Sequence, residues 1–278
     1  GGTPSTLDEG EKLRDPKDAL PILKRLELGM ELARIDPERS ARELTAVLED
    51  APDAALPRRY RAVALAASGH HEAAIADMRV LEKSGSLTTE DLIVMGDSLR
   101  LAGRVEEALA ALDKAAALQP SSPLPWLTRA NTLIGAGRAD EAAQAYERAL
   151  AITPEHAEAL RGLGDLALVR GDLPTAAAFY TRVLAGAPAD VGATVKLGVV
   201  RMRTGQRDEA ESLFRRAIAA DPRSGEALLY LAGTLVAGNR HAEAIPYFEQ
   251  AIAGGQKSPV LYNGLGMTKL QLGDRAGA

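Results

Sequence analysis

Residues 123–156 read PLPWLTRANTLIGAGRADEAAQAYERALAITPEH, and this stretch of 34 residues decides the fold. It holds two apolar patterns of helical spacing, one on each side of Gly137, and it ends shortly after Pro154. The same features recur 34 residues earlier and 34 residues later along the chain. A fixed period of this length predicts a protein built from stacked structural repeats.

The repeat keeps its register along most of the 278 residues, without an insertion. Glycine recurs at the centre of successive repeats (Gly69, Gly103, Gly137, Gly171 and Gly205), and alanine follows five residues later (Ala74, Ala108, Ala142, Ala176, Ala210 and Ala244). In this frame residues 1–20 are a linker or extended N-terminal arm, and 21–54 are an atypical capping repeat. Residues 55–258 form six regular repeats, and 259–278 contain the first helix of a partial eighth repeat.

Each repeat is expected to form two amphipathic helices. In residues 123–156 the first helix presents Trp126 and Leu133 at helical spacing. Gly137 ends it, because glycine readily adopts the left-handed conformation common at helix C-termini. The second helix begins near Asp140, where an acidic side chain favours the free N–H groups of a first turn, and it stops before Pro154.

The pattern Trp126…Ala130…Leu133…Ala142…Tyr146…Ala149…Pro154 resembles the tetratricopeptide repeat, and the resemblance covers residues 21–278. It implies an all-α fold, a right-handed superhelical solenoid of stacked antiparallel helix pairs with seven repeats and part of an eighth. It also implies a non-catalytic protein–protein interaction scaffold. Such a scaffold binds a peptide or protein segment in a concave groove lined by the first helices.

We placed the family's groove positions on each repeat of this chain. These positions predict a largely aliphatic surface with a few polar residues. The predicted partner-binding residues are Leu127, Asn131, Ile134, Arg161, Asp165, Leu168, Val195, Val199, Met202, Arg203, Leu229 and Val236. The apolar members would anchor an apolar segment, and the two arginines would set its orientation. In the alternative interpretation, the aliphatic residues pack between neighbouring first helices and Arg161 pairs with Asp165 four residues later.

Some members of the family bind C-terminal carboxylates through a clamp of basic and asparagine side chains. In this sequence Leu127 replaces a basic residue of that clamp, and Gly162 replaces an asparagine. Gly192 replaces another basic residue, while Asn131 and Lys196 agree with the pattern. We therefore do not expect a carboxylate clamp.

Composition narrows the classes of function further. The net charge is −5 with acidic and basic residues interspersed, which argues against a nucleic-acid binder with a basic stripe. No apolar run approaches the roughly 18 residues that span a membrane. There is no cysteine, and the four histidines fall in turns within or between repeats that are far apart, apart from the neighbours His70 and His71, so we expect no metal, cofactor or catalytic residue.

Two alternative roles remain open at this stage. Residues 259–278 could join two copies of the chain, because their apolar first helix has no second helix over it. The segment Asp15-Pro16-Lys17-Asp18 also resembles one that joins the catalytic domain of some bacterial sulfatase-like chains to C-terminal repeats. The chain begins at Gly1 without methionine, and we expect it to be an excised fragment of a longer protein. Abundant alanine and arginine are typical of bacterial proteins, and the sequence does not specify a compartment.

Overall fold

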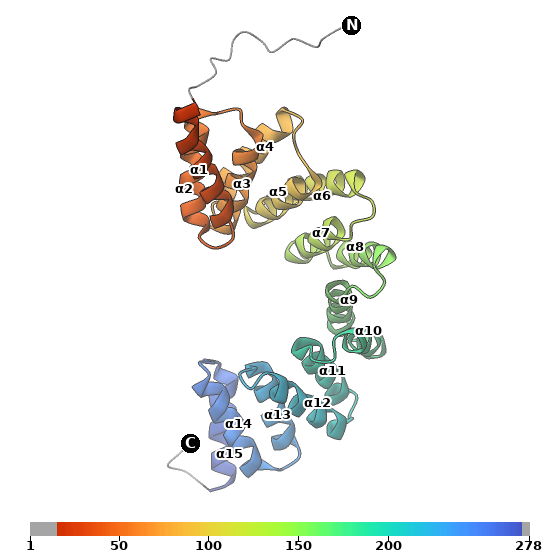
Figure 1. The fold of residues 1–278 in the computed structure, drawn as a ribbon. Coiled ribbons are helices and arrows are strands. Elements are labelled where there is room, and N and C mark those ends of the chain that lie inside the picture. The colour runs from red at the N-terminus through yellow and green to blue at the C-terminus, as the bar shows by residue number, and fades with distance from the viewer. Residues whose placement is uncertain (1–15, 274–278) are drawn as a thin grey trace. The chain divides into compact units, whose positions relative to one another are not determined.

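The computed structural model of the chain describes residues 16–273, which form fifteen α-helices and no β-strand. The predicted all-α fold of stacked helix pairs is therefore confirmed. The helices divide into two compact units, an N-terminal unit of residues 1–137 and a C-terminal unit of residues 138–278 (Figure 1).

In the N-terminal unit each helix packs on the next one along the chain. The first helices of successive repeats also contact each other, α1 with α3, α3 with α5 and α5 with α7, and so form a common face. The helices of this unit are α1 (Pro16–Leu32), α2 (Pro37–Asp50), α3 (Ala55–Ala67), α4 (His71–Lys83), α5 (Thr89–Leu101), α6 (Val105–Leu118) and α7 (Leu124–Gly135).

The C-terminal unit is built in the same way. Consecutive helices pack together, and α13 contacts both α11 and α15. Its helices are α8 (Ala139–Ile152), α9 (Ala157–Arg170), α10 (Leu173–Gly186), α11 (Val191–Arg203), α12 (Arg207–Ala220), α13 (Gly225–Ala237), α14 (His241–Ala253) and α15 (Pro259–Gln271). We call the side formed by α9, α11, α13 and α15, or by α3, α5 and α7 in the other unit, the first-helix face.

The first helix begins earlier in the chain than the sequence analysis predicts. Residues 16–20, assigned to the arm from sequence, form the first turn of α1, which begins at Pro16. Proline suits this place because the first residues of a helix need no N–H partner within the helix. The rest of the predicted arm, residues 1–15, lies outside the described residues, as do residues 274–278 of the partial repeat.

The turn between the two helices of a repeat has a left-handed residue, as the glycine pattern predicts. Gly103 has a φ of 76° and Gly205 a φ of 82°. In repeat 225–258 the same place is taken by Asn239, whose φ is 61°. Asparagine tolerates this conformation better than most residues with a side chain, so the turn is kept without glycine.

Glycines inside the first helices make room for large buried side chains of the second helices. A Cβ atom added at Gly198 would lie 2.5 Å from Cε1 of Phe214, and one at Gly164 would lie 2.8 Å from Cε1 of Tyr180. Phe214 and Tyr180 are fully buried. These small residues let the two helices of a repeat approach closely, which holds the first helices in place for the face that they form.

Candidate functional site

The predicted partner-binding residues divide between the two units. Leu127, Asn131 and Ile134 lie on α7 of the N-terminal unit, and the other nine lie on α9, α11 and α13 of the C-terminal unit. Leu127 is buried, whereas Asn131 and Ile134 are exposed. The structure therefore brings nine of the twelve residues onto one first-helix face.

The apolar members in the C-terminal unit belong to one hydrophobic cluster. Val195 and Val199 are buried within it, with exposed fractions of 1% and 8%. These two valines therefore pack between neighbouring first helices, as in the alternative interpretation. The other four lie partly exposed against the cluster, where a ligand could reach them: Leu168, Met202, Leu229 and Val236.

The polar members bind neighbouring groups of the protein. Arg161 pairs with Asp190 across 3.0 Å rather than with Asp165. Nη1 of Arg203 donates to the carbonyl of Leu168, 3.0 Å away in the last turn of α9, where a cation is electrostatically favoured. A guanidinium has five N–H donors, so both exposed arginines retain donors for a partner.

Asp165 accepts a hydrogen bond of 2.7 Å from the hydroxyl of Tyr180. Burial, together with this bond and the negative charge of Asp165, raises the pKa of Tyr180 well above its ordinary value. The tyrosine therefore stays protonated and continues to donate over the physiological pH range. Asp165 is fixed by the second helix of its own repeat.

A pocket of 300 Å³ opens on the first-helix face between α13 and α15. This volume lies at the low end of the roughly 300–1,000 Å³ of small-molecule sites, so it suits one or two side chains. Two predicted residues, Leu229 and Val236, form its α13 side. The complete lining is Leu229, Gly233, Val236, His241, Phe248, Val260, Gly264, Met267, Thr268 and Gln271.

Two glycines create this pocket. A Cβ atom at Gly233 would meet no other atom within 4 Å, so the helix surface there is open. At Gly264 a Cβ atom would lie 2.8 Å from the ring of Phe248, so its absence leaves the ring as part of the lining. The sequence prediction placed the family's groove positions on this chain and considered only side chains that could contact a partner. It therefore missed both glycines. A glycine in mid-helix without a packing partner is the signal that could have found the pocket.

The polar groups of the pocket mostly have partners. The hydroxyl of Thr268 donates to the carbonyl of Gly264, four residues earlier in α15, at 2.6 Å. Nε2 of His241 lies 2.9 Å from Oδ1 of Asn239 in the turn before α14. Nδ1 of the same histidine is buried without a hydrogen-bond partner among residues 16–273. The pocket is thus an apolar recess with one imidazole in its wall.

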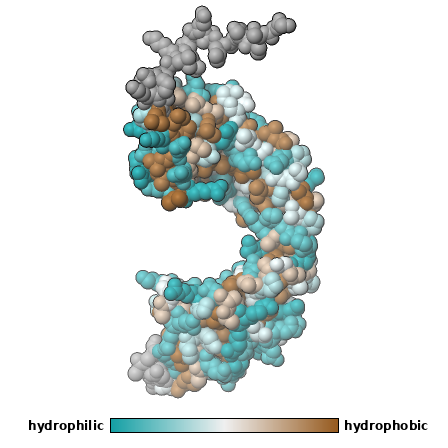
Figure 2. Space-filling model, in the orientation of Figure 1, coloured by the Kyte–Doolittle hydropathy of each residue, from teal (hydrophilic) through white to brown (hydrophobic). Residues whose placement is uncertain are grey.

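Exposed apolar side chains gather on α15. Figure 2 shows hydrophilic and hydrophobic residues interspersed over the visible face of the chain. On α15 itself, by contrast, only Leu261 and Thr268 are buried. Val260 and Met267 are exposed by 63% and 66%, and Leu270 by 54%. An apolar surface of this kind on a soluble helix commonly marks an interaction site.

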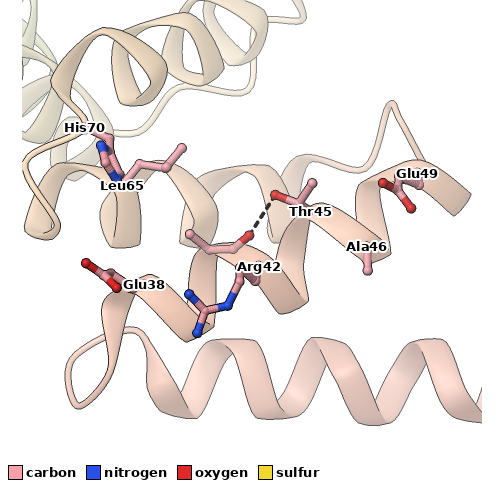
Figure 3. A pocket seen from close by; sticks show the side chains of 8 residues that line it. Glu38, Arg42, Thr45, Ala46, Glu49, Leu65 and His70 are labelled. Atoms are coloured by element: carbon pink, nitrogen blue, oxygen red, sulfur yellow. Dashed lines mark hydrogen bonds between the residues drawn. The ribbon is translucent and has the colours of Figure 1, made fainter.

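Another pocket, of 480 Å³, lies between α2 and the end of α3 in the N-terminal unit. Figure 3 shows Glu38, Arg42 and Glu49 along α2, with His70 on the opposite side. The hydroxyl of Thr45 donates to the carbonyl of Ala41 at 2.7 Å. With charges of both signs and no converging donors, this pocket offers a ligand little to recognise.

Sequence comparison agrees with the architecture. A family model described as tetratricopeptide repeat matches residues 31–86, 127–191 and 195–259, and a second model of that description matches residues 92–114. The chain is a tetratricopeptide repeat protein. The family generally provides non-catalytic scaffolds that bind protein partners, and this repeat protein carries the family's helix pairs in both units.

Solved structures of other tetratricopeptide repeat proteins share the fold. A tetratricopeptide repeat protein from Parabacteroides merdae has a TM-score of 0.66 at 14% identity, covering 90% of this chain and 99% of its own. PilF from Pseudomonas aeruginosa has a TM-score of 0.62 at 19% identity, over 68% and 86%. YrrB has a TM-score of 0.53 at 21% identity, over 66% and 95%. No curated protein sequence matches the chain.

The described residues were also compared with the requirements for crossing a membrane and for binding a metal ion. Among residues 16–273, no helix combines the length and apolar character that crossing a membrane requires. The same residues hold no cluster of three or more His, Cys, Asp or Glu side chains placed to bind a metal ion.

Proposed function

We propose that the protein is an interaction scaffold that binds a peptide or protein segment on the first-helix face of the C-terminal unit, with a bulky apolar side chain inserted between α13 and α15. The observation that carries this proposal is the recess around Gly233. Its walls are mostly apolar, its floor includes Phe248, and its residue Leu229 packs against the same hydrophobic cluster as Leu168 and Met202.

The free energy of burying one side chain in the recess suits a partner that makes several separate contacts along the face. Burying one leucine, methionine or phenylalanine side chain contributes about 1.5–3 kcal/mol. That is too little for a stable complex alone, since a Kd of about 1 µM requires about 8 kcal/mol. Further contacts along the face, at Leu168 and Met202, would supply the remainder. Arg161 and Arg203 would bond carbonyl or carboxylate groups of the segment with their remaining donors.

The comparison with YrrB supports this reading. YrrB is described as a tetratricopeptide repeat protein with an unusual peptide-binding site, and its fold is shared by this chain. The proposed site differs from a carboxylate clamp because its central feature is an apolar recess. Its partner would be selected by the size of one side chain rather than by a terminal carboxylate.

The test is a selection of displayed random peptides on the full chain, followed by affinity measurement with Gly233→Leu. A Cβ atom at this position meets nothing within 4 Å, so the new side chain should extend into the recess and occupy it. Gly186→Leu is the matched control, since Gly186 is also a helical glycine with nothing within 4 Å but lies on the second helix α10. The expected result is at least tenfold weaker binding for Gly233→Leu, the equivalent of about 1.4 kcal/mol, and no change for the control.

A further variant examines the α13 wall independently. Leu229→Glu places a charge in the apolar recess and leaves the buried valines of the cluster untouched, so binding should be lost with little change in Tm. Selected peptides that bind Gly233→Leu and Leu229→Glu as tightly as the unmodified chain would exclude the recess as the binding site. The same conclusion follows if the selected peptides share no apolar residue.

Self-assembly is a second candidate, favoured by the exposed apolar residues of α15. Val260, Tyr262 and Leu270 would meet the same surface of another copy. Light scattering over a range of concentrations would show dimers that Tyr262→Lys and Leu270→Lys abolish together. A chain that stays monomeric at every concentration would rule this candidate out.

A further inference from the structure

The N-terminal unit has a pocket of its own on the first-helix face, with a volume of 420 Å³, between α3 and α5. We propose that it binds the neutral amide side chain of a glutamine or asparagine in a protein partner. This site lies in the other unit and is independent of the recess between α13 and α15. Its lining is Val63, Ala66, Ala67, His71, Ile93, Val94, Asp97, Ser98, Leu101 and Thr128.

The main observation is an unused hydroxyl. Ser98 lines the pocket and is 1% exposed, and its Oγ has no hydrogen-bond partner among residues 16–273. Leaving a buried hydrogen-bonding group unpaired destabilises the protein. A ligand group that bonds Ser98, after its side chain turns towards the pocket, would recover this free energy, whereas a purely apolar ligand would not.

Equivalent positions of other repeats show that the unpaired hydroxyl is particular to this site. Thr132, Thr234 and Thr268 lie 34 residues, or multiples of 34 residues, after Ser98. Each of their hydroxyls donates to the carbonyl four residues earlier in its own helix, at 2.8, 2.7 and 2.6 Å. The Ser98 hydroxyl does not make this bond, and it is the one among these positions that lines the α3–α5 pocket.

The adjacent charge is already neutralised within the protein. Nε and Nη2 of Arg100 both donate to Oδ1 of Asp97, at 3.0 and 2.6 Å. A ligand carboxylate would be repelled by Asp97, and a ligand ammonium would meet a carboxylate that is already paired with Arg100. The pair therefore favours an uncharged ligand that can still donate to the carboxylate of Asp97.

A primary amide satisfies both groups at once. Its N–H groups donate to the carboxylate of Asp97, and its oxygen accepts from the hydroxyl of Ser98. The methylene groups before the amide would pack against the apolar walls, which include Val63, Ile93 and Leu101. Nδ1 of His71, a second buried atom without a partner among the described residues, belongs to the same lining and offers the amide a further contact.

The experiment is a titration of the full chain, with labelled isoleucine, leucine and valine methyl groups, followed by NMR. The probe is N-acetyl-glutamine N′-methylamide. The comparison compounds are the methionine analogue, which has a similar length but an apolar end, and the glutamate analogue, which has a charged end. The methyl signals of Val63, Ile93 and Leu101 report this pocket separately from those of Leu229 and Val236 between α13 and α15.

The expected result is that the glutamine compound causes saturable shifts of the methyl signals of Val63, Ile93 and Leu101. Its affinity should be about fivefold higher than that of either analogue, which is the factor that one hydrogen bond of about 1 kcal/mol provides. Ser98→Ala should remove this preference over the methionine analogue while the chain stays folded, because alanine is a good helix former and the lost hydroxyl had no partner. Equal or stronger binding of the methionine compound, stronger binding of the glutamate compound, or an unchanged preference in Ser98→Ala would each overturn the proposal. So would the absence of saturable shifts at these methyl groups, as expected if water alone occupies the pocket.

Discussion

Exchanging glycine for alanine in two neighbouring first helices should change stability in opposite directions. Gly198 in α11 and Gly233 in α13 are both helical, and neither is a terminal residue of its helix. Alanine stabilises a helix interior by about 1 kcal/mol relative to glycine. If helix propensity alone determined the result, both substitutions would raise the free energy of unfolding by a similar amount.

The surroundings of the two positions differ sharply. At Gly198 the new Cβ atom would lie 2.5 Å from Cε1 of Phe214 and 3.0 Å from two more atoms of that ring, whereas carbon atoms pack best about 3.5–4.0 Å apart. The ring cannot easily move, because Phe214 is fully buried and stacks on Tyr230 with centroids 5.5 Å apart. Overpacking of this kind costs about 1–3 kcal/mol. At Gly233 the Cβ atom meets nothing within 4 Å.

We therefore expect Gly198→Ala to lower the free energy of unfolding by about 2 kcal/mol, the upper end of the overpacking cost less the gain in propensity. Gly233→Ala should raise it by about 1 kcal/mol. The two variants should then differ in Tm by roughly 6 °C or more, at about 2–4 °C per kcal/mol for a chain of this size class. Thermal unfolding followed by circular dichroism measures the difference.

The steric cause has its own control, which is the pair Gly198→Ala and Phe214→Leu. Because the smaller side chain removes the overlapping ring atoms, the double variant should lose less stability than the sum of the two single losses. Equal Tm values for Gly198→Ala and Gly233→Ala, or strict additivity in the double variant, would refute the reasoning from ring contact.

Substitutions at three further positions examine other parts of the fold. Burial raises the pKa of Tyr146 to about 12, above the unfolded value of about 10. The protonated tyrosine therefore contributes its full stability below pH 10, and this contribution is lost as the pH rises towards 12. Tyr146→Phe should flatten the fall of Tm between about pH 9 and 12. Asn239→Ala should cost about 1 kcal/mol in urea unfolding because of the left-handed φ of 61°, and Asn239→Gly should cost nothing. Arg59→Met should cost about 3 kcal/mol, because Nε of Arg59 bonds the buried Asp91 at 2.7 Å; a loss under 1 kcal/mol would mean that the remaining bonds of Asp91 suffice.

The 34-residue period was sufficient to predict the helix pairs and the turns between them. These features depend on local sequence and repeat identically, so one stretch such as residues 123–156 describes most of them. Asn239 shows how the pattern tolerates change: the turn needs a left-handed residue, and asparagine is the usual substitute for glycine. The helical start at Pro16 was missed because proline was taken as a break, although it is favoured at a helix N-terminus.

The first-helix face was harder to predict from sequence. Leu229 and Val195 occupy the same groove position of neighbouring repeats, yet Val195 is buried while Leu229 remains partly exposed. Small differences in how neighbouring helices pack decide which of two equivalent aliphatic residues reaches the surface, and the repeat period does not carry that information. The same is true of Arg161, whose partner Asp190 is the residue directly before α11.

The glycines separate packing from function most clearly. One set, which includes Gly103 and Gly205, is required by a left-handed φ. A second set, which includes Gly198, is required by a ring that occupies the place of the missing side chain. Gly233 meets neither requirement, and it weakens α13 by about 1 kcal/mol relative to alanine. Natural proteins commonly accept such a local loss at functional sites, which makes the recess beside Gly233 the part of the face where a ligand best accounts for the sequence.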